Sequence, residues 1–264
     1  MTDQLELPRR VEIAPMSPVA PAAWTPEVHA AAYAHAVACY PAEAAGVVEG
    51  GAYMPLDNIS NTPNDDVVLS DEDLVRVGMG DLFFHSHPDG LACPSETDMI
   101  YQQQLGIPFV VMCMPIYDIF WFGDLERQPL LGRGFRHGVH DCYALIRDWY
   151  LEHGIMRLWD QPRAWEWWGR SQGKDLYTEN FAAAGFHRID PADAFRAGDV
   201  LLFNFHYPVP MHGGLVTRDP NLIMHHPSGV KAADPTRLSK LEPGNRLRRF
   251  VTVALRHEDL PDVA

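Results

Sequence analysis

The sequence has few of the features that would place it in a membrane, on nucleic acid or outside the cell. No apolar run approaches the roughly 18 residues that span a bilayer, and no N-terminal stretch resembles a secretory signal. Only 21 Lys and Arg residues oppose 35 Asp and Glu residues, for a formal net charge of -14. Nucleic acid and anionic membranes both reward clustered cations, so neither is expected as a partner. We expect a protein made in the cytoplasm, without membrane insertion, and a neutral or cationic peptide substrate is compatible with its charge.

Cysteine is also scarce, and repeats are absent. The four cysteines, Cys39, Cys93, Cys113 and Cys142, match no Cys-x-x-Cys zinc pattern. Four cysteines allow two bridges, but a chain of 264 residues does not need disulfides to be stable. The hydrophobic fraction of 47% is ordinary, and the length suffices for two modest domains with separate cores.

The first half of the chain mixes helix and strand patterns. Thr25-Pro26-Glu27 combines a capping residue, a first-turn proline and an acid, which predicts a helix that ends before Pro41. Further patterns predict strands near 47–48, 67–69 and 81–87, a helix over 96–105, and a strand pair over 108–114 and 117–122. We expect an extended N-terminal arm over 1–21 and a mixed α/β domain over 22–125.

The second half begins again after a segment punctuated by Pro and Gly. Residues 126–136 are typical of a linker. A helix is predicted over 141–153, followed by strands over 199–203, 213–217, 221–225 and 250–255. Because the helix comes first and the strands later, we expect an α+β domain over 137–258.

The first domain contains a group of residues with metal-ligand spacing. His85 and His87 alternate along a predicted strand and so face one side, while Ser95 and Asp98 begin the next helix. Two imidazoles and a carboxylate leave a fourth zinc position open, as catalytic zinc requires. Each part also has a plain explanation, since Ser95-x-x-Asp98 is close to a capping box. The complete pattern His-x-His-x(7)-Ser-x(2)-Asp is much rarer than its parts and favours the metal site.

This spacing resembles the motif of the JAMM (MPN-type) metallopeptidases, which also carries an upstream Glu-x-x-Gly. Glu43, in Tyr40-Pro41-Ala42-Glu43-Ala44-Ala45-Gly46, fits that upstream element. Glu49 is a rival, because it too is followed by glycines, but it lacks the preceding Tyr-Pro. The resemblance implies that Glu43 takes a proton from a bound water and that Ser95 stabilises the developing oxyanion. It also implies a Zn²⁺ ion held by His85, His87 and Asp98.

A second candidate site opens the second domain. Asp141 can cap the predicted helix, which puts Cys142 in the first turn. There the helix dipole is expected to lower the pKa of the thiol and favour the nucleophilic thiolate. A buried structural cysteine is the commoner fate of a lone Cys, but His212 and the pair His225-His226 follow in the predicted strands.

This order resembles the NlpC-type cell-wall peptidases, a papain-like family. An Asp-Cys begins a helix there, a Gly-Asp strand follows, and a His opens the next strand. The resemblance implies that Cys142 is the nucleophile, His212 the base and His225 the group that orients His212, with His226 as a rival for the last role. The chain departs from the common Asp-Cys-Ser-Gly, because Tyr143 and Ala144 follow Cys142.

The two motifs in this order, over residues 25–258, resemble a tail assembly protein family of lambda-like siphophages and their prophages. The resemblance implies tail-tip proteins as partners, and a location in the host cytoplasm during assembly and then in the virion tail tip. It also implies a zinc metallopeptidase combined with a cysteine endopeptidase that cuts peptidoglycan stem peptides. The alternative is an assembly or structural component with weak or vestigial peptidase activity. A host deubiquitinase-like hydrolase is disfavoured by the second domain.

Three tryptophans close to one another add a further candidate surface. Trp165, Trp167 and Trp168 could line a groove for a peptide or a sugar. Aromatic residues dominate cores and interfaces, so we expect a packing cluster or a subunit contact instead.

Overall fold

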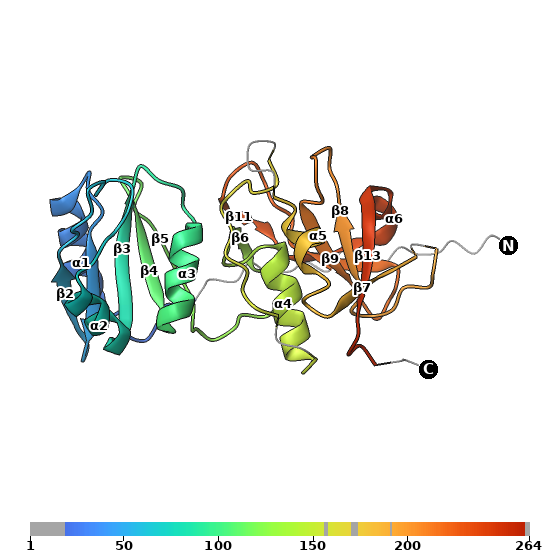
Figure 1. Ribbon diagram of the computed structural model, residues 1–264, viewed down its shortest axis with the longest axis horizontal. Helices are drawn as coiled ribbons and strands as arrows, with labels where there is room; N and C mark the ends of the chain where they lie inside the picture. Colours follow the sequence, from blue (N-terminus) through green and yellow to red (C-terminus); the bar gives the residue numbers. More distant parts are fainter. Residues whose placement is uncertain (1–18, 156–157, 170–173, 191, 262–264) are drawn as a thin grey trace.

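The computed structural model describes residues 19–155, 158–169, 174–190 and 192–261. The predicted N-terminal arm falls mostly on residues 1–18, which lie outside the described residues. Figure 1 shows two sheet-based units that follow one another along the chain, the first in blue to green and the second in yellow to red. No described helix has the length and apolar content that crossing a membrane would require.

The N-terminal unit is built on a five-stranded mixed sheet. Its strand order is β2-β1-β3-β4-β5; β3 and β4 are parallel, and the other neighbours are antiparallel. The predicted strand near 67–69 is wrong, because the Val68 N–H donates to the side-chain oxygen of Asn58 (3.1 Å) and no strand forms there. The strands are β1 (Ala45–Glu49), β2 (Ala52–Leu56), β3 (Leu82–Pro88), β4 (Phe109–Met114) and β5 (Asp118–Phe122).

Helices cover both faces of this sheet. One face packs against the small apolar side chains of α1 (Pro26–Cys39), which Thr25 caps by accepting from the Val28 N–H, as the sequence predicts. The opposite face contacts Val77 of α2 (Asp71–Met79) and Leu105 of α3 (Glu96–Leu105). The sheet is therefore a sandwiched layer, and β3 is central in it.

The C-terminal unit has a six-stranded antiparallel sheet in the order β12-β10-β9-β8-β13-β7 and a separate ribbon of β11 and β6. The predicted linker 126–136 contains β6 (Gly134–Arg136). The other strands are β7 (Phe186–Ile189), β8 (Val200–Phe203), β9 (His212–Val216), β10 (Leu222–His225), β11 (Ala233–Leu238), β12 (Lys240–Pro243) and β13 (Val251–His257). The helices are α4 (Cys142–Glu152), α5 (Leu176–Asn180), α6 (Gly244–Leu247) and the 3-10 turn η1 (Arg248–Phe250).

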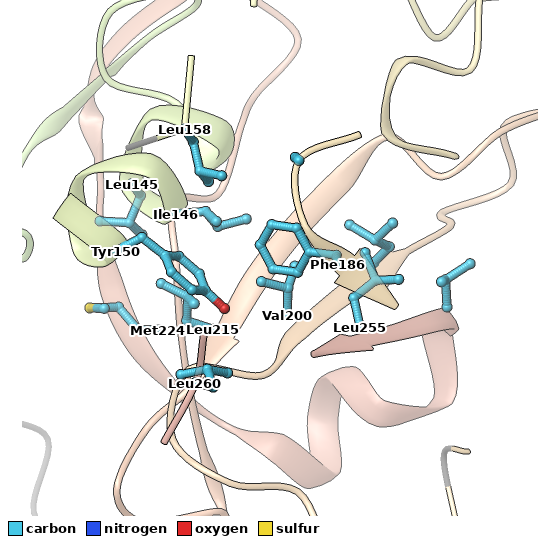
Figure 2. Close-up of a cluster of buried hydrophobic side chains, with 13 residues drawn as sticks. Leu145, Ile146, Tyr150, Leu158, Phe186, Val200, Leu215, Met224, Leu255 and Leu260 are labelled. Atoms are coloured by element: carbon cyan, nitrogen blue, oxygen red, sulfur yellow. The ribbon is translucent and has the colours of Figure 1, made fainter. Parts of the chain in front are cut away.

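The helix α4 packs on the sheet and forms the main core of this unit. Figure 2 shows Ile146 and Tyr150 of α4 turned toward Val200 and Leu215 of the sheet. The Tyr150 hydroxyl donates to the Gly198 carbonyl at 2.6 Å, so this buried polar atom has a partner. The helix predicted over 141–153 and the four predicted strands are confirmed to within two residues at each end.

A series of linked ion pairs, partly buried, holds α4 in place. Asp148 receives a hydrogen bond from the fully buried Arg133 (2.6 Å) and pairs with Arg147 (3.0 Å). Arg147 also pairs with Asp160 (2.5 Å). These contacts fix α4, and with it Cys142, relative to the segment that precedes β6.

Arg136 of β6 reaches across to the N-terminal unit. Its guanidinium donates to both carboxylate oxygens of Asp118 (3.1 and 3.3 Å) and to the Ala92 carbonyl, and it lies over the Phe120 ring (4.5 Å). Ala92 belongs to the loop between β3 and α3, so this one side chain joins the second unit to the segment that carries the His-x-His motif.

Candidate functional sites

The three predicted metal ligands converge at the end of β3. The Nε2 atoms of His85 and His87 are 3.1 Å apart, and the two Asp98 carboxylate oxygens lie 3.2 Å from His85 Nε2 and His87 Nε2 respectively. Strand alternation places both imidazoles on one side of the sheet, and the start of α3 brings Asp98 to them. Among the described residues this is the one group of three or more His, Cys, Asp or Glu side chains placed to share a metal ion.

The donor set fits a zinc ion. His87 Nδ1 lies 3.2 Å from the Leu91 carbonyl, which places its proton on Nδ1 and leaves the Nε2 lone pair for a ligand. Two imidazole nitrogens 3.1 Å apart and facing a carboxylate require a proton or a cation between them. The imidazoles hold the pKa of Asp98 well below its usual value although its burial acts in the opposite direction. Two His and one Asp leave a tetrahedral position open.

Glu43 lies beside this cluster, whereas Glu49 does not. In the antiparallel pair β1–β3, Ala45 lies opposite His85, and the Ser86 N–H donates to the Ala44 carbonyl. One residue further along, this register brings Glu43 next to His87. Burial raises the pKa of Glu43 to about 6, and the nearby imidazoles act in the opposite direction. Glu49 instead forms an ion pair with Arg76 (2.9 Å).

Ser95 and Asp98 form the capping box as well as the metal motif. The Ser95 hydroxyl accepts from the Asp98 N–H (3.0 Å), and the Asp98 carboxylate accepts from the Ser95 N–H (2.7 Å). The two interpretations of this motif are therefore compatible, because the cap orients the carboxylate toward His85 and His87. The capping box uses a lone pair of the Ser95 hydroxyl, and its hydrogen is left for another acceptor.

Cys142 is the first residue of α4, as predicted. Asp141 caps the helix by accepting from the Ala144 N–H (2.9 Å). Its other carboxylate oxygen accepts from the Gly138 N–H (2.9 Å) and pairs with Arg163 (2.7 Å). The expected low thiol pKa is wrong: burial raises the pKa of Cys142 to about 11, and the Asp141 carboxylate adds to this. The thiol is therefore protonated at neutral pH.

The two predicted histidine partners lie together on neighbouring strands. His212 begins β9 and His225 ends β10, and His212 Nε2 lies 3.0 Å from His225 Nδ1. Burial lowers the pKa of His212 to about 3 and that of His225 to about 2, so both rings are neutral. The rival His226 lies 3.0 Å from the Arg237 carbonyl instead.

Strand β9, which begins with His212, packs on α4, which begins with Cys142. The backbone N–H of Gly213, the residue after His212, lies near enough to Cys142 to act against the rise in the pKa of its thiol. A Cβ at Gly213 would lie 2.8 Å from Ile146 of α4 and 3.2 Å from the Tyr177 hydroxyl. A side chain at position 213 would therefore require Ile146 and Tyr177 to shift, so the glycine suits this close approach.

Two further residues of this site have no counterpart in the sequence motifs. The Tyr177 hydroxyl of α5 lies 3.2 Å from the Cys142 sulfur, and Arg163 neutralises the capping Asp141. Beside them is a cavity of about 80 Å³, which Trp167 and Trp168 help to line. Trp165 packs edge-on against His137 and Trp168, in keeping with the expected packing cluster.

Comparison with known proteins gives both the domain and the family. Residues 25–123 match the family model of prokaryotic homologs of the JAB domain, which confirms a JAB-like N-terminal domain. The chain is 38% identical over 166 residues to the tail tip assembly protein K of Escherichia phage lambda, covering 60% of this chain and 77% of the relative. It is 30% identical over 201 residues to the protein of the same name of Escherichia phage N15, covering 73% and 81%. The chain therefore belongs to the tail tip assembly protein K family.

Proposed function

We propose that this protein acts in the assembly of a phage tail tip as a hydrolase with two peptidase sites, a JAMM-type zinc site and an NlpC-type, papain-like cysteine site. The convergence of His85, His87 and Asp98 beside Glu43 carries the first. The pairing of His212 with His225, with β9 packed on the helix that begins with Cys142, supports the second. The names of the two relatives support the assembly role and tail-tip proteins as partners. Such a protein would work in the host cytoplasm and then in the tail tip.

In the metal site, the side chains divide the chemistry among them. His85, His87 and Asp98 would hold the ion, which when bound supplies a Lewis acid that acidifies water and polarises a carbonyl. Glu43, with a pKa of about 6, is ionised at neutral pH and can take the proton of the attacking water. It can then deliver that proton to the leaving amine. The free hydrogen of the Ser95 hydroxyl can stabilise the oxyanion.

In the cysteine site, a neutral His212 acts on a protonated thiol. His212 removes the thiol proton as the Cys142 sulfur attacks the substrate carbonyl carbon, and it returns the proton to the leaving amine. Water then hydrolyses the thioester, which releases the acid and restores the thiol. The Gly213 N–H, which lies near the thiol, is a candidate oxyanion donor. His225 keeps the His212 ring in position.

Mass spectrometry of cleavage products tests this proposal directly. The zinc-loaded chain is incubated with purified muropeptides and, separately, with denatured casein. Glu43→Gln should abolish one set of products while the matched Glu49→Gln retains it, because Glu49 pairs with Arg76 away from the metal ligands. Cys142→Ser should abolish a second set, and Cys39→Ser, at another partly exposed cysteine, should not.

The alternative function is assembly without peptide hydrolysis by the cysteine site. The high pKa of Cys142 favours a site that is idle until a partner opens it. Absence of cleavage by wild type, together with tail assembly that survives Glu43→Gln and Cys142→Ser, would support this alternative over the peptidase.

A further inference from the structure

We propose that the cavity beside Cys142 is the side-chain pocket of the cysteine site and takes one aliphatic side chain of a polypeptide substrate, next to the scissile bond. This rests on the proposed cysteine peptidase and names its substrate class. It favours a protein chain over the stem peptides that the family resemblance implies.

The position of the cavity relates it to the nucleophile. Cys142 and Ile146, one turn apart on α4, both line it, and Tyr177 of α5, whose hydroxyl contacts the sulfur, lies in the same wall. Its wall also includes Ala184 and Phe186, which belong to the apolar core beneath α4. In Figure 2, Ile146 and Phe186 face one another across this part of the core. A side chain that enters beside the sulfur would therefore be surrounded by apolar groups.

The few charged groups in the wall already have partners. Arg163 donates through Nε (3.2 Å) and Nη2 (2.7 Å) to Asp141, and through Nη1 to the Gln161 carbonyl (2.6 Å). Asp141 also caps α4. His137 Nε2 lies 3.1 Å from the Arg163 carbonyl. No cation in the described wall is left to receive a substrate carboxylate, and burying an uncompensated carboxylate is strongly unfavourable.

The size of the cavity limits the occupant. About 80 Å³ is several times the ~10–15 Å³ needed for one water molecule and about half of a cavity known to take up benzene. A Leu or Met side chain fits this space, whereas a lipid chain is too long. Stem peptides offer methyl groups and charged side chains, which would leave the cavity partly empty or bury a charge.

The first test uses two peptide series that differ only at the residue before the cleaved bond. Wild type should cleave peptides with Leu or Met at this position with a kcat/KM at least about tenfold higher than peptides with Ala or Glu. A factor of about ten is the lower end of the discrimination that an apolar pocket achieves. Ala184→Leu adds a larger side chain to the cavity wall and should remove this preference. Ala183→Leu, the same change at an exposed neighbour, should retain it.

A second test needs no turnover. Bromoacetyl-leucinamide and bromoacetyl-glutamate amide each alkylate the Cys142 sulfur, which bonds to the CH2 carbon as bromide leaves and the thiol proton passes to solvent. The labelling rates are measured by intact-protein mass spectrometry. In wild type and in Ala183→Leu, the leucine label should react at least about tenfold faster than the glutamate label. In Ala184→Leu, the two labels should react at similar rates.

The outcomes separate this inference from the proposed function. Equal labelling rates in wild type, or cleavage that prefers Glu or Ala, would overturn the pocket assignment while the peptidase stands. Selective leucine labelling without cleavage of any peptide would support the pocket and overturn the peptidase. The wild-type comparison decides the matter even where a cavity-filling variant does not fold.

Discussion

Asp148→Asn removes the counter-charge of the most deeply buried cation in the described structure. Arg133 is fully buried, and its guanidinium donates to Asp148 (2.6 Å), to the Pro129 carbonyl (2.8 Å) and to the Gln128 carbonyl. Breaking one partner of a buried ion pair costs about 3–5 kcal/mol. Asparagine still offers an oxygen to Arg133, so we expect the lower end, about 3 kcal/mol, in the free energy of unfolding. For a unit of this size, that loss lowers Tm by about 10 °C.

The assay is urea unfolding followed by tryptophan fluorescence, with calorimetry for Tm. The signal reports mainly the C-terminal unit, because five of the seven tryptophans lie there (Trp149, Trp159, Trp165, Trp167 and Trp168). Arg246→Gln is the matched control, since it breaks an exposed pair with Glu242 (3.0 Å) that is worth about 0.5 kcal/mol or less. Equal destabilisation by the two variants would refute the stabilising role of the buried pair.

Three further predictions concern the sites and their connection. His87→Ala should lose the one equivalent of zinc that gel-filtered wild type and Glu49→Gln retain in elemental analysis; retention by His87→Ala would place the ion elsewhere. Alkylation of Cys142 by iodoacetamide should accelerate about tenfold per pH unit between pH 7 and 10, because the thiolate fraction rises this way below a pKa of about 11; a plateau below pH 8 would contradict a raised pKa. Arg136→Gln should separate the calorimetric transitions of the two units, and unchanged transitions would mean that this residue does not couple them.

Much of the fold follows from local patterns in the sequence. Runs such as Val200–Phe203 are continuous and apolar because both faces of their strand are buried, and Thr25-Pro26-Glu27 begins a helix by capping alone. The sequence patterns do not predict helix α2. Ser70 nevertheless caps this helix, because its hydroxyl accepts from the Asp73 N–H and donates to the Asp73 carboxylate. Strand β6 pairs with β11, about a hundred residues later, and no local pattern indicates such a partner.

The residues of the two candidate sites also differ in how far the sequence predicts them. His85 and His87 could be found because strand alternation and the spacing to Asp98 are local constraints. Tyr177 could not, since its contact with Cys142 spans 35 residues without a fixed spacing. The pKa of Cys142 was predicted in the wrong direction, because the helix dipole is visible in the sequence whereas burial by α5 and β9 appears only in the fold.

Two inhibitors used on the wild-type protein test most directly whether one chain holds two independent peptidase sites. Products from casein and muropeptides are mapped after treatment with 1,10-phenanthroline, with iodoacetamide, or with both. Two separate sets of cleaved bonds are expected. One is lost to the chelator and restored by added zinc, and the other is lost only to alkylation of Cys142. One set of bonds lost equally to both reagents would contradict two independent sites.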